Sequence, residues 1–314
     1  MIDGTRNIRQ FLGIPAGPAV VSPLNLPVNP SPGCCNSCTL KVLADQTGNP
    51  TQNDISTVIW WFNLTTTAAN IMIMKYVNGA WVQQGSTLTT SNTTYGQFNQ
   101  FAYYTNEENQ NFISLQVNWA AIQSAFGNGS YKFTCNYTDP ILGNGATDSY
   151  EFCLFLYSPQ MAEGTVRLEY TLTGTSADIN NRTLIKDYGT LQILNHIRVE
   201  GVFGYPDSPY KSEYNEDIFG HKNWIEDYMD EQLQLTLVMV PWWIHKIIRV
   251  DFMMAESLAI SDYNSMNNDN YISVGVIKDS GYKPDHYILQ NINSPVDLKF
   301  KPADNRSRRY KPNQ

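Results

Sequence analysis

The chain has 314 residues, of which 42% are hydrophobic and only 16% are Asp, Glu, Lys or Arg, where roughly a quarter is usual. Its formal net charge of −8 disfavours broad binding to nucleic acid or to anionic membranes, because both require a positive field. No segment has the ~18 uninterrupted apolar residues of a membrane-spanning helix, and the residues after Met1 do not form a secretory signal pattern.

Residues 1–33 are predicted to form an extended, proline-rich arm. The stretch 14–33 reads IPAGPAVVSPLNLPVNPSPG and contains six prolines. Proline removes a backbone donor and fixes φ, so this stretch disfavours both a helix and a central strand. We expect the arm either to float free or to lie along a partner.

Residues 34–176 are predicted to form an immunoglobulin-like β-sandwich domain, with a jelly roll as the close alternative. Short β-prone runs alternate with polar turns, whereas the stretch 86–105 has no clear period and is interpreted as a long connection or as irregular strands. The predicted strands are Thr39–Leu43, Ile55–Phe62, Asn70–Tyr76, Phe112–Asn118, Tyr131–Asn136, Tyr150–Tyr157 and Thr165–Leu172.

Residues 177–300 are predicted to form a second β-rich domain. Of the fifty charged residues of the chain, thirty-eight lie in 151–314, so the two halves face different surroundings. Apolar residues alternate in several runs, as they do in strands with one buried face. The predicted elements are strands at Leu191–Phe203, Gln232–Met239, Ile244–Phe252, Ile272–Val276 and Val296–Phe300, and a short helix at Met253–Ile260.

The stretch 205–231 is interpreted as a long acidic loop within the second domain. It reads YPDSPYKSEYNEDIFGHKNWIEDYMDE, which is too long and too rich in Pro and charge for a tight connection. Long loops in compact domains are usually functional or disordered. A glycoside hydrolase would need two facing carboxylates, for which Glu226 and Asp227 are the candidates, but solvated acids are the commoner explanation.

Residues 301–314 are predicted to form a basic tail. Four cations crowd the last nine residues, and they are candidates for contact with DNA phosphates or with an acidic neighbour. A solvated tail explains them equally well. These residues are Arg306, Arg308, Arg309 and Lys311.

The five cysteines disfavour a disulfide framework and favour synthesis in a reducing cytoplasm. Cys35 and Cys38, beside Cys34, have the spacing of half a zinc or redox site, but the other half is missing. Cys135 and Cys153 stand alone in predicted strands and are interpreted as buried thiols. No metal or other cofactor is predicted.

Other sequence motifs give little support for an enzyme. The stretch Asp262–Asp269 resembles a calcium loop but lacks the glycine at its sixth position and the glutamate at its twelfth. The chain has no GxGxxG after a strand, no GxxxxGK[ST] and no GxSxG. The four histidines, interpreted as structural, are His196, His221, His245 and His286.

Two stretches of the chain have a distinctive sequence: SYEFCLFLYSPQMAEGTVRLEYTLTG at 149–174, and WWIHKIIRVDFMMAESLAISDYNSMNN at 242–268 leading into DSGYKPDHY at 279–287. They resemble tail and neck proteins of crAss-like bacteriophages and related elements of Bacteroides. The resemblance implies a virion structural protein, made in the cytoplasm of the bacterial host. Its copies would form a closed ring, expected to be twelve-fold, that contacts other ring, portal or muzzle proteins and encloses the DNA channel.

The expected function is therefore to hold neighbouring subunits together without catalysis. Pro241, Trp242, Trp243 and Ile244 are the predicted subunit interface, because adjacent tryptophans on a strand point to opposite faces and one core rarely buries both. Burial of both within a two-sided sheet is the equal alternative.

A receptor- or glycan-binding module of a tail fibre or adhesin is the second hypothesis, and a glycoside hydrolase is the third. In the second hypothesis, aromatic side chains would stack on sugar rings. The candidate platforms are Trp60, Trp61, Tyr103 and Tyr104.

Overall fold

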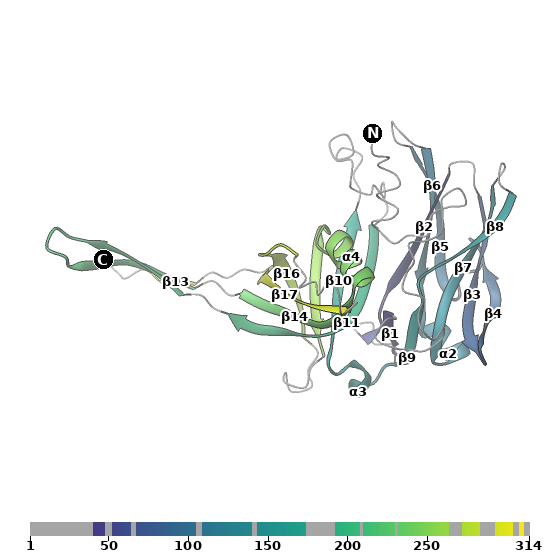
Figure 1. Ribbon diagram of the computed structural model, residues 1–314, viewed down its shortest axis with the longest axis horizontal. Coiled ribbons are helices and arrows are strands. Elements are labelled where there is room, and N and C mark those ends of the chain that lie inside the picture. The colour runs from purple at the N-terminus through teal and green to yellow at the C-terminus, as the bar shows by residue number, and fades with distance from the viewer. Residues whose placement is uncertain are drawn as a thin grey trace.

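The computed structural model describes residues 40–47, 52–63, 67–104, 109–139, 143–173, 192–207, 210–229, 232–263, 272–282, 293–303 and 308–310. The protein is mainly β, which confirms the predicted fold class at that level. It has a layered part, a closed six-stranded barrel beside it, and a long hairpin that projects from the barrel (Figure 1). The predicted arm at 1–33 lies outside the described residues. Within the described ranges, no helix is long and apolar enough to cross a membrane.

The layered part consists of two sheets that share an apolar core. Its strands are β1 Leu40–Ala44, β2 Ser56–Asn63, β3 Thr67–Val77, β4 Ala80–Leu88, β5 Gly96–Tyr104, β6 Asn109–Val117, β7 Gly129–Asp139, β8 Gly143–Asp148 and β9 Phe152–Leu156. The larger sheet has the order β1-β9-β7-β3-β4, with β8 also paired to β7, and the smaller has the order β2-β6-β5. Trp60 of the smaller sheet and Phe133 of the larger belong to one buried cluster.

Of the two interpretations of the stretch 86–105, strands and not a long connection are found, because β4 and β5 occupy most of it. Asn78 and Gly79 have φ of 51° and 89° and form the tight turn that joins β3 to β4, as Asn-Gly pairs do in hairpins. Most side chains of β4 are exposed or only partly buried, so its sequence carries no apolar alternation. Because this edge strand is mostly polar, its sequence has no apolar period from which a strand is predicted.

Two short helices complete the layered part. The helix α2, Trp119–Phe126, begins after Asn118, whose side chain accepts a hydrogen bond from the backbone of Ala121. The helix α3, Pro159–Ala162, is capped in the same way by Ser158 and leads from β9 towards the barrel. Trp119 is buried against Phe152, with ring centroids 5.1 Å apart.

The barrel is a ring of six antiparallel strands. Its members are β10 Thr165–Thr173, β11 Gln192–Asp207, β14 Gln232–Pro241, β15 Ser257–Asp262, β16 Ile272–Lys278 and β17 Asn293–Pro302. The ring order is β10-β11-β14-β17-β16-β15, and it closes because β10 pairs with β11 on one edge and with β15 on the other. The strand Thr165–Thr173, which the sequence analysis placed in the sandwich, therefore belongs to the barrel.

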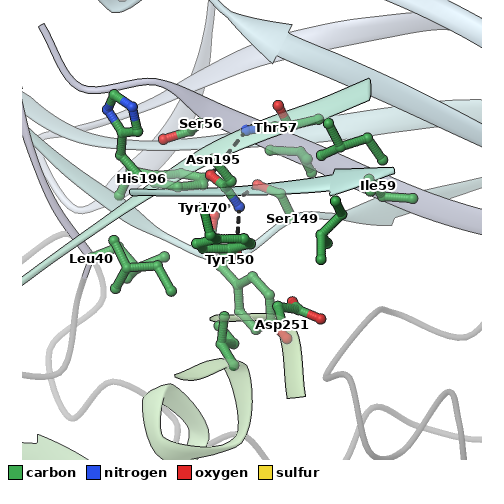
Figure 2. Close-up of a pocket in the computed structure, with 16 residues that line it drawn as sticks. Leu40, Ser56, Thr57, Ile59, Ser149, Tyr150, Tyr170, Asn195, His196 and Asp251 are labelled. Atoms are coloured by element: carbon green, nitrogen blue, oxygen red, sulfur yellow. Dashed lines mark hydrogen bonds between the residues drawn. The ribbon is translucent and has the colours of Figure 1, made fainter. Parts of the chain in front are cut away.

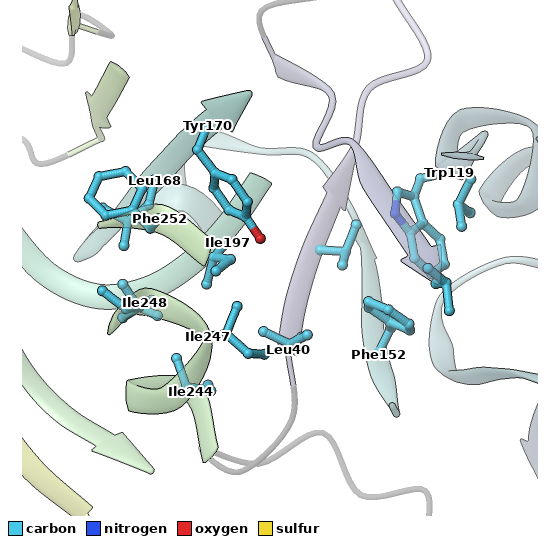
Figure 3. Packing of buried hydrophobic residues seen from close by; sticks show 14 of the residues in the cluster. Leu40, Trp119, Phe152, Leu168, Tyr170, Ile197, Ile244, Ile247, Ile248 and Phe252 are labelled. Atoms are coloured by element: carbon cyan, nitrogen blue, oxygen red, sulfur yellow. The ribbon is translucent and has the colours of Figure 1, made fainter. Parts of the chain in front are cut away.

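The barrel and the layered part are joined by β1. This strand pairs in parallel with β9 of the layered part, and Lys41 pairs with Arg198 of β11 in the barrel. Buried side chains on both sides, including Leu40, Ile197 and Phe152, belong to one continuous apolar cluster (Figure 3). The division into domains at residue 176 stays a prediction.

The segment 242–262 folds in the reverse order to that predicted. Where a strand was expected at Ile244–Phe252, the chain forms the helix α4, Trp242–Ile247, and a π-helical turn η3, Ile248–Phe252. Where a helix was expected at Met253–Ile260, Ser257–Asp262 forms β15. The β-branched composition favoured a strand, but the buried positions have helical spacing. They are Ile244, Ile247, Ile248 and Phe252.

This helical segment fills the interior of the barrel. The ring of Phe252 lies 6.1 Å from that of Tyr170 on β10 and 6.1 Å from that of Phe300 on β17. These two strands lie on opposite sides of the six-stranded ring. Phe252 is fully buried between them, so the barrel of a single chain is a packed core and not a channel.

The predicted acidic loop 205–231 is largely a β-hairpin. The strands β12, Tyr210–Glu216, and β13, Lys222–Met229, pair along their length, and β18, Arg308–Tyr310, pairs with β13. The hairpin leaves the barrel between β11 and β14 and extends away from it (Figure 1). Its residues mix charge and aromatic character on both faces, so they lack the alternation by which half-buried strands are predicted.

Candidate functional site

The tip of the hairpin is an ordered turn that presents two apolar side chains to solvent. The Asp217 carboxylate accepts hydrogen bonds from the backbone N–H groups of Phe219 and His221, both at 2.8 Å. These bonds, that of His221 foremost, lower the pKa of Asp217. Gly220 adopts a φ of 81°, which favours glycine. Ile218 and Phe219 are 93% and 78% exposed.

The hairpin makes no extensive contact with the described residues of the barrel or the layered part. Tyr214 on β12 is 51% exposed, and the Lys222 ammonium lies 4.8 Å from the centre of its ring. A small sheet without a packed hydrophobic face is marginally stable in water. A hairpin this long with an apolar tip is therefore of the kind expected to contact another molecule.

A small cavity of about 80 Å³ lies where the layered part meets the barrel (Figure 2). On its wall, Asn195 donates to the Tyr170 hydroxyl at 2.9 Å and accepts from the backbone N–H of Thr57 at 3.3 Å. Small-molecule sites usually have volumes of about 300 Å³ or more. The cavity is large enough only for a few water molecules, and its polar groups mainly tie β2 to β11.

Three titratable groups around this cavity have pKa values far from neutral pH. Burial, followed by the charge of Asp251, raises the pKa of Tyr150 and of Tyr170. Burial and then the charge of Arg167 lower the pKa of His196 to about 4. The neutral His196 accepts a hydrogen bond at Nδ1 from the backbone N–H of Ile55 at 3.0 Å. General acid–base catalysis favours a pKa near the working pH, whereas the pKa values of these three groups lie far from neutral pH.

A buried ionic cluster fastens the layered part to the barrel. Asp54, between β1 and β2, accepts two hydrogen bonds from Arg198 of β11, both at 2.8 Å. Arg167 of β10 lies 3.5 Å from the same carboxylate and 2.8 Å from Glu169. Burial acts to raise the pKa of Asp54, but the two guanidinium groups together lower it. The cluster fixes the two parts in one geometry.

His245 on α4 lies between a serine and a tyrosine, an arrangement that invites comparison with catalytic triads. Its Nδ1 shares a hydrogen bond with the Tyr282 hydroxyl, and its Nε2 lies 2.9 Å from Ser294 Oγ and 3.1 Å from the Ser294 carbonyl oxygen. Both ring nitrogens of His245 are therefore engaged by groups of the same chain. Ser294 is also only 4% exposed. The arrangement anchors α4 to β17.

The predicted subunit interface at 241–244 lies at the end of β14 and the start of α4. Pro241 is buried within the chain, and Ile244 is 3% exposed in the barrel core. The subunit interface at 241–244 stays a prediction. The side chains of Trp242 and Trp243 lie outside what the structure describes.

The cysteines divide into two kinds. Cys135 is a buried free thiol, as predicted, and burial raises its pKa to about 12. Cys153 is disulfide-bonded, so the interpretation of Cys153 as a buried thiol was wrong. In the part of the chain that the structure describes, no three His, Cys, Asp or Glu side chains are grouped to hold a metal ion.

Few of the other predicted site residues can be placed. Trp60 is fully buried, so its ring has no face on which a sugar can stack. Side chains of the remaining candidates for glycan, carboxylate or DNA contact lie outside the described residues, as does most of the calcium-like stretch. Those candidates are Trp61, Tyr103, Tyr104, Glu226, Asp227, Arg306, Arg308, Arg309 and Lys311, together with Cys34, Cys35 and Cys38.

The sequence matches no protein family model and no curated protein. The described residues form a layered part, a filled barrel and a projecting hairpin.

Proposed function

We propose that this chain is a non-enzymatic virion structural protein, a subunit of a ring in a phage tail or neck that joins the portal to the distal tail. The observation that carries the proposal is the projecting hairpin, whose Ile218 and Phe219 are left 93% and 78% exposed. Exposed apolar groups on an ordered arm are typical of surfaces that bind other proteins. The layered part is proposed to be an immunoglobulin-like sandwich, on the basis of its two facing sheets.

The filled barrel supports a particular position for the DNA channel. Phe252 packs between opposite walls of the barrel, so DNA has no path through one chain. A conduit built from this protein would lie on the axis of a closed ring of copies, with each barrel in its wall. Closed cyclic arrays are a common symmetry of homo-oligomers.

The seam between the two parts also suits a structural role. The strand β1 makes one sheet continuous from the layered part into the barrel, and Asp54, Arg167 and Arg198 form an ionic cluster beside it. A ring closes at one size only when every subunit keeps the same shape. The continuous sheet and the ionic cluster together hold the layered part and the barrel in one relative arrangement, so that every subunit keeps the same shape.

The test is the assembly state of the purified full-length chain, measured by mass photometry and negative-stain microscopy from nanomolar to micromolar concentration. We expect closed rings of one size, with twelve-fold symmetry. A chain that stays monomeric throughout this range would overturn the proposal. If that monomer bound cell-surface glycans on an array, the receptor-binding hypothesis would take its place.

A further inference from the structure

We propose that residues 54–57 form an acid-released latch, which holds the layered part against the barrel at neutral pH and lets it pivot about β1 when His196 gains a proton. A latch of this kind is independent of the proposed function, because it acts within one chain. Its parts are the hydrogen bonds across the seam, the charges beside them and the narrow attachment of β1.

The latch residues bond to β11 through both backbone and side chains. Ile55 donates its backbone N–H to His196 Nδ1 at 3.0 Å and accepts from the backbone N–H of His196 at 2.8 Å. Thr57 donates its backbone N–H to the Asn195 side chain at 3.3 Å (Figure 2). The start of β2 is thus fastened to the barrel at successive positions along β11.

The latch also carries the ionic contact described above and is anchored to the layered part. Asp54 accepts two hydrogen bonds from Arg198, both at 2.8 Å. Ser56 bonds instead to the layered part, where its hydroxyl oxygen accepts from the Trp119 Nε1–H at 2.9 Å. The latch therefore belongs to the layered part, and opening it means separating Asp54, Ile55 and Thr57 from β11.

The strand β1 is suited to act as the hinge. It pairs with β9 of the layered part at five positions but with β11 of the barrel at one, where Lys41 lies opposite Arg198. A single register pair restrains rotation less than a ladder of five does. Hinges in proteins are commonly a few residues at the ends of elements. With the latch open, β1 keeps the two parts joined while they change their relative angle.

His196 is the latch contact whose bonding changes with protonation. Its Nδ1 accepts from the Ile55 N–H, which requires the lone pair of a neutral imidazole. An imidazolium carries N–H groups on both nitrogens, so Nδ1 and the Ile55 N–H would meet as two donors. A buried donor without an acceptor is costly. Protonation of His196 therefore favours the open state, in which water can hydrate both groups.

Four charged groups beside His196 balance one another while its ring is neutral. Arg167 lies 2.8 Å from Glu169, and Arg198 lies 2.8 Å from Asp54. Because both carboxylates are already paired, a proton on His196 would add a third cation to a buried, balanced cluster. Burial and then the charge of Arg167 lower the pKa of His196 to about 4, in agreement with this geometry.

The other titratable groups near the seam do not offset such a charge. Across the cavity, the charge of Asp251 acts on Tyr150 and Tyr170, whereas the charges that act on His196 are those of the four-residue cluster. On β1, Lys41 is a further cation. The cavity of about 80 Å³, which His196 also lines, is large enough for a few water molecules, so water can reach the ring when the latch loosens.

Hydrogen–deuterium exchange of the full-length chain tests the latch, with the backbone N–H groups of Ile55 and Thr57 as reporters. Strands β6 and β14 are the references, because each lies between two strands within its own part. From pH 7 to pH 5, with rates divided by the intrinsic rate at each pH, we expect the reporters to exchange on the order of 20-fold faster. This factor follows from a His196 pKa of about 4 in the closed state and about 6.5 in the open state. The references are expected to keep their protection.

Two variants identify the group that responds to acid. His196→Gln takes up no proton in this range, and its side-chain oxygen can accept from the Ile55 N–H, so its reporters are expected to exchange alike at pH 7 and pH 5. The control is His221→Gln, which removes a histidine with a 75% exposed side chain at the hairpin tip. It is expected to keep the full response of the wild type.

The wild-type chain alone can overturn the latch. Reporters that exchange no faster at pH 5 than at pH 7 would show that no latch opens. References that accelerate as much as the reporters would show unfolding of the whole chain and not a pivot about β1. A wild-type response retained by His196→Gln would show that another group is the trigger. None of these results bears on ring formation, so the proposed function is tested separately.

Discussion

Asp54 is a carboxylate in a protein core, where an ion is stable only if it is paired and hydrogen-bonded. It accepts from Arg198 twice and from the backbone of Leu43, and it lies beside Arg167. We predict that Asp54→Asn lowers the free energy of unfolding by about 3–5 kcal/mol, because two buried guanidinium groups lose their shared counterion. Urea denaturation followed by tryptophan fluorescence measures this.

The control for Asp54→Asn is an ion pair near the surface. Lys132 and Asp148 are 2.6 Å apart, with side-chain exposures of 17% and 47%. Lys132→Gln is expected to cost less than about 1 kcal/mol, because water screens and replaces this pair. Equal costs for the two variants would contradict a special role for the Asp54 cluster.

His196 gives the protein a predicted acid sensitivity. Its pKa is lowered to about 4 in the folded chain, first by burial and then by Arg167, against about 6.5 when unfolded. Between these values the unfolded chain binds one more proton than the folded chain. Stability is therefore fully present above pH 6.5 and falls by an amount on the order of 3 kcal/mol as the pH decreases to 4.

The pH dependence is measured by urea denaturation at a series of pH values between 7 and 4. The variant His196→Gln cannot titrate there, so its stability is expected to fall less steeply than that of the wild type. Asp54 and Glu169 have pKa values lowered from 3.8 and 4.5, so their stabilisation is lost only below those pH values, beneath most of the interval in which His196 titrates. The difference between the two curves therefore isolates His196, and parallel curves would refute its role.

At the scale of elements, the helical segment that fills the barrel is the most sensitive part of the core. Phe252 is fully buried, whereas Met254, two residues later, is 58% exposed. We predict that Phe252→Ala lowers the free energy of unfolding by about 3–5 kcal/mol through the cavity it leaves. Met254→Ala is expected to change it by less than about 0.5 kcal/mol. Thermal and urea denaturation compare the two.

Strands with one buried face could be predicted from the sequence, whereas elements without a single buried face could not. The strand Thr165–Thr173 was predicted because Val166, Leu168 and Tyr170 alternate with polar residues. The helix α4 was misassigned because its isoleucines favour strands, although their spacing was helical. The hairpin β12–β13 makes no extensive contact with the described residues of the body, so little in its sequence was constrained to alternate.

At the scale of the whole molecule, closure of the barrel depends on pairings between distant residues. Val166 pairs with Asp262, almost a hundred residues later, and Lys41 pairs with Arg198. Local propensity carries no information on such pairs, so the sequence indicated two β-rich parts but neither the barrel nor its seam. The projecting tip could have been suspected from Ile218 and Phe219, which are apolar residues inside an acidic stretch.

The hairpin is predicted to be dispensable for folding and essential for assembly. Asp207 and Gln232 are paired neighbours where β11 and β14 leave the barrel, so a two-residue Asn-Gly turn can replace residues 208–231 without altering their register. Because the hairpin makes no extensive contact with the described body, the free energy of unfolding is expected to stay within about 1 kcal/mol of the wild type. Mass photometry is expected to show monomers where the wild type forms rings.

The two readouts of this deletion separate its possible failures. A shortened chain that melts like the wild type but still forms rings would show that the subunits join through another surface. A shortened chain that unfolds readily would show that the hairpin stabilises the barrel, contrary to its isolation in the structure. A stable monomer would instead mean that the body folds without the hairpin. It would also mean that neighbouring copies are joined through the hairpin, while the filled barrel forms the wall of the ring.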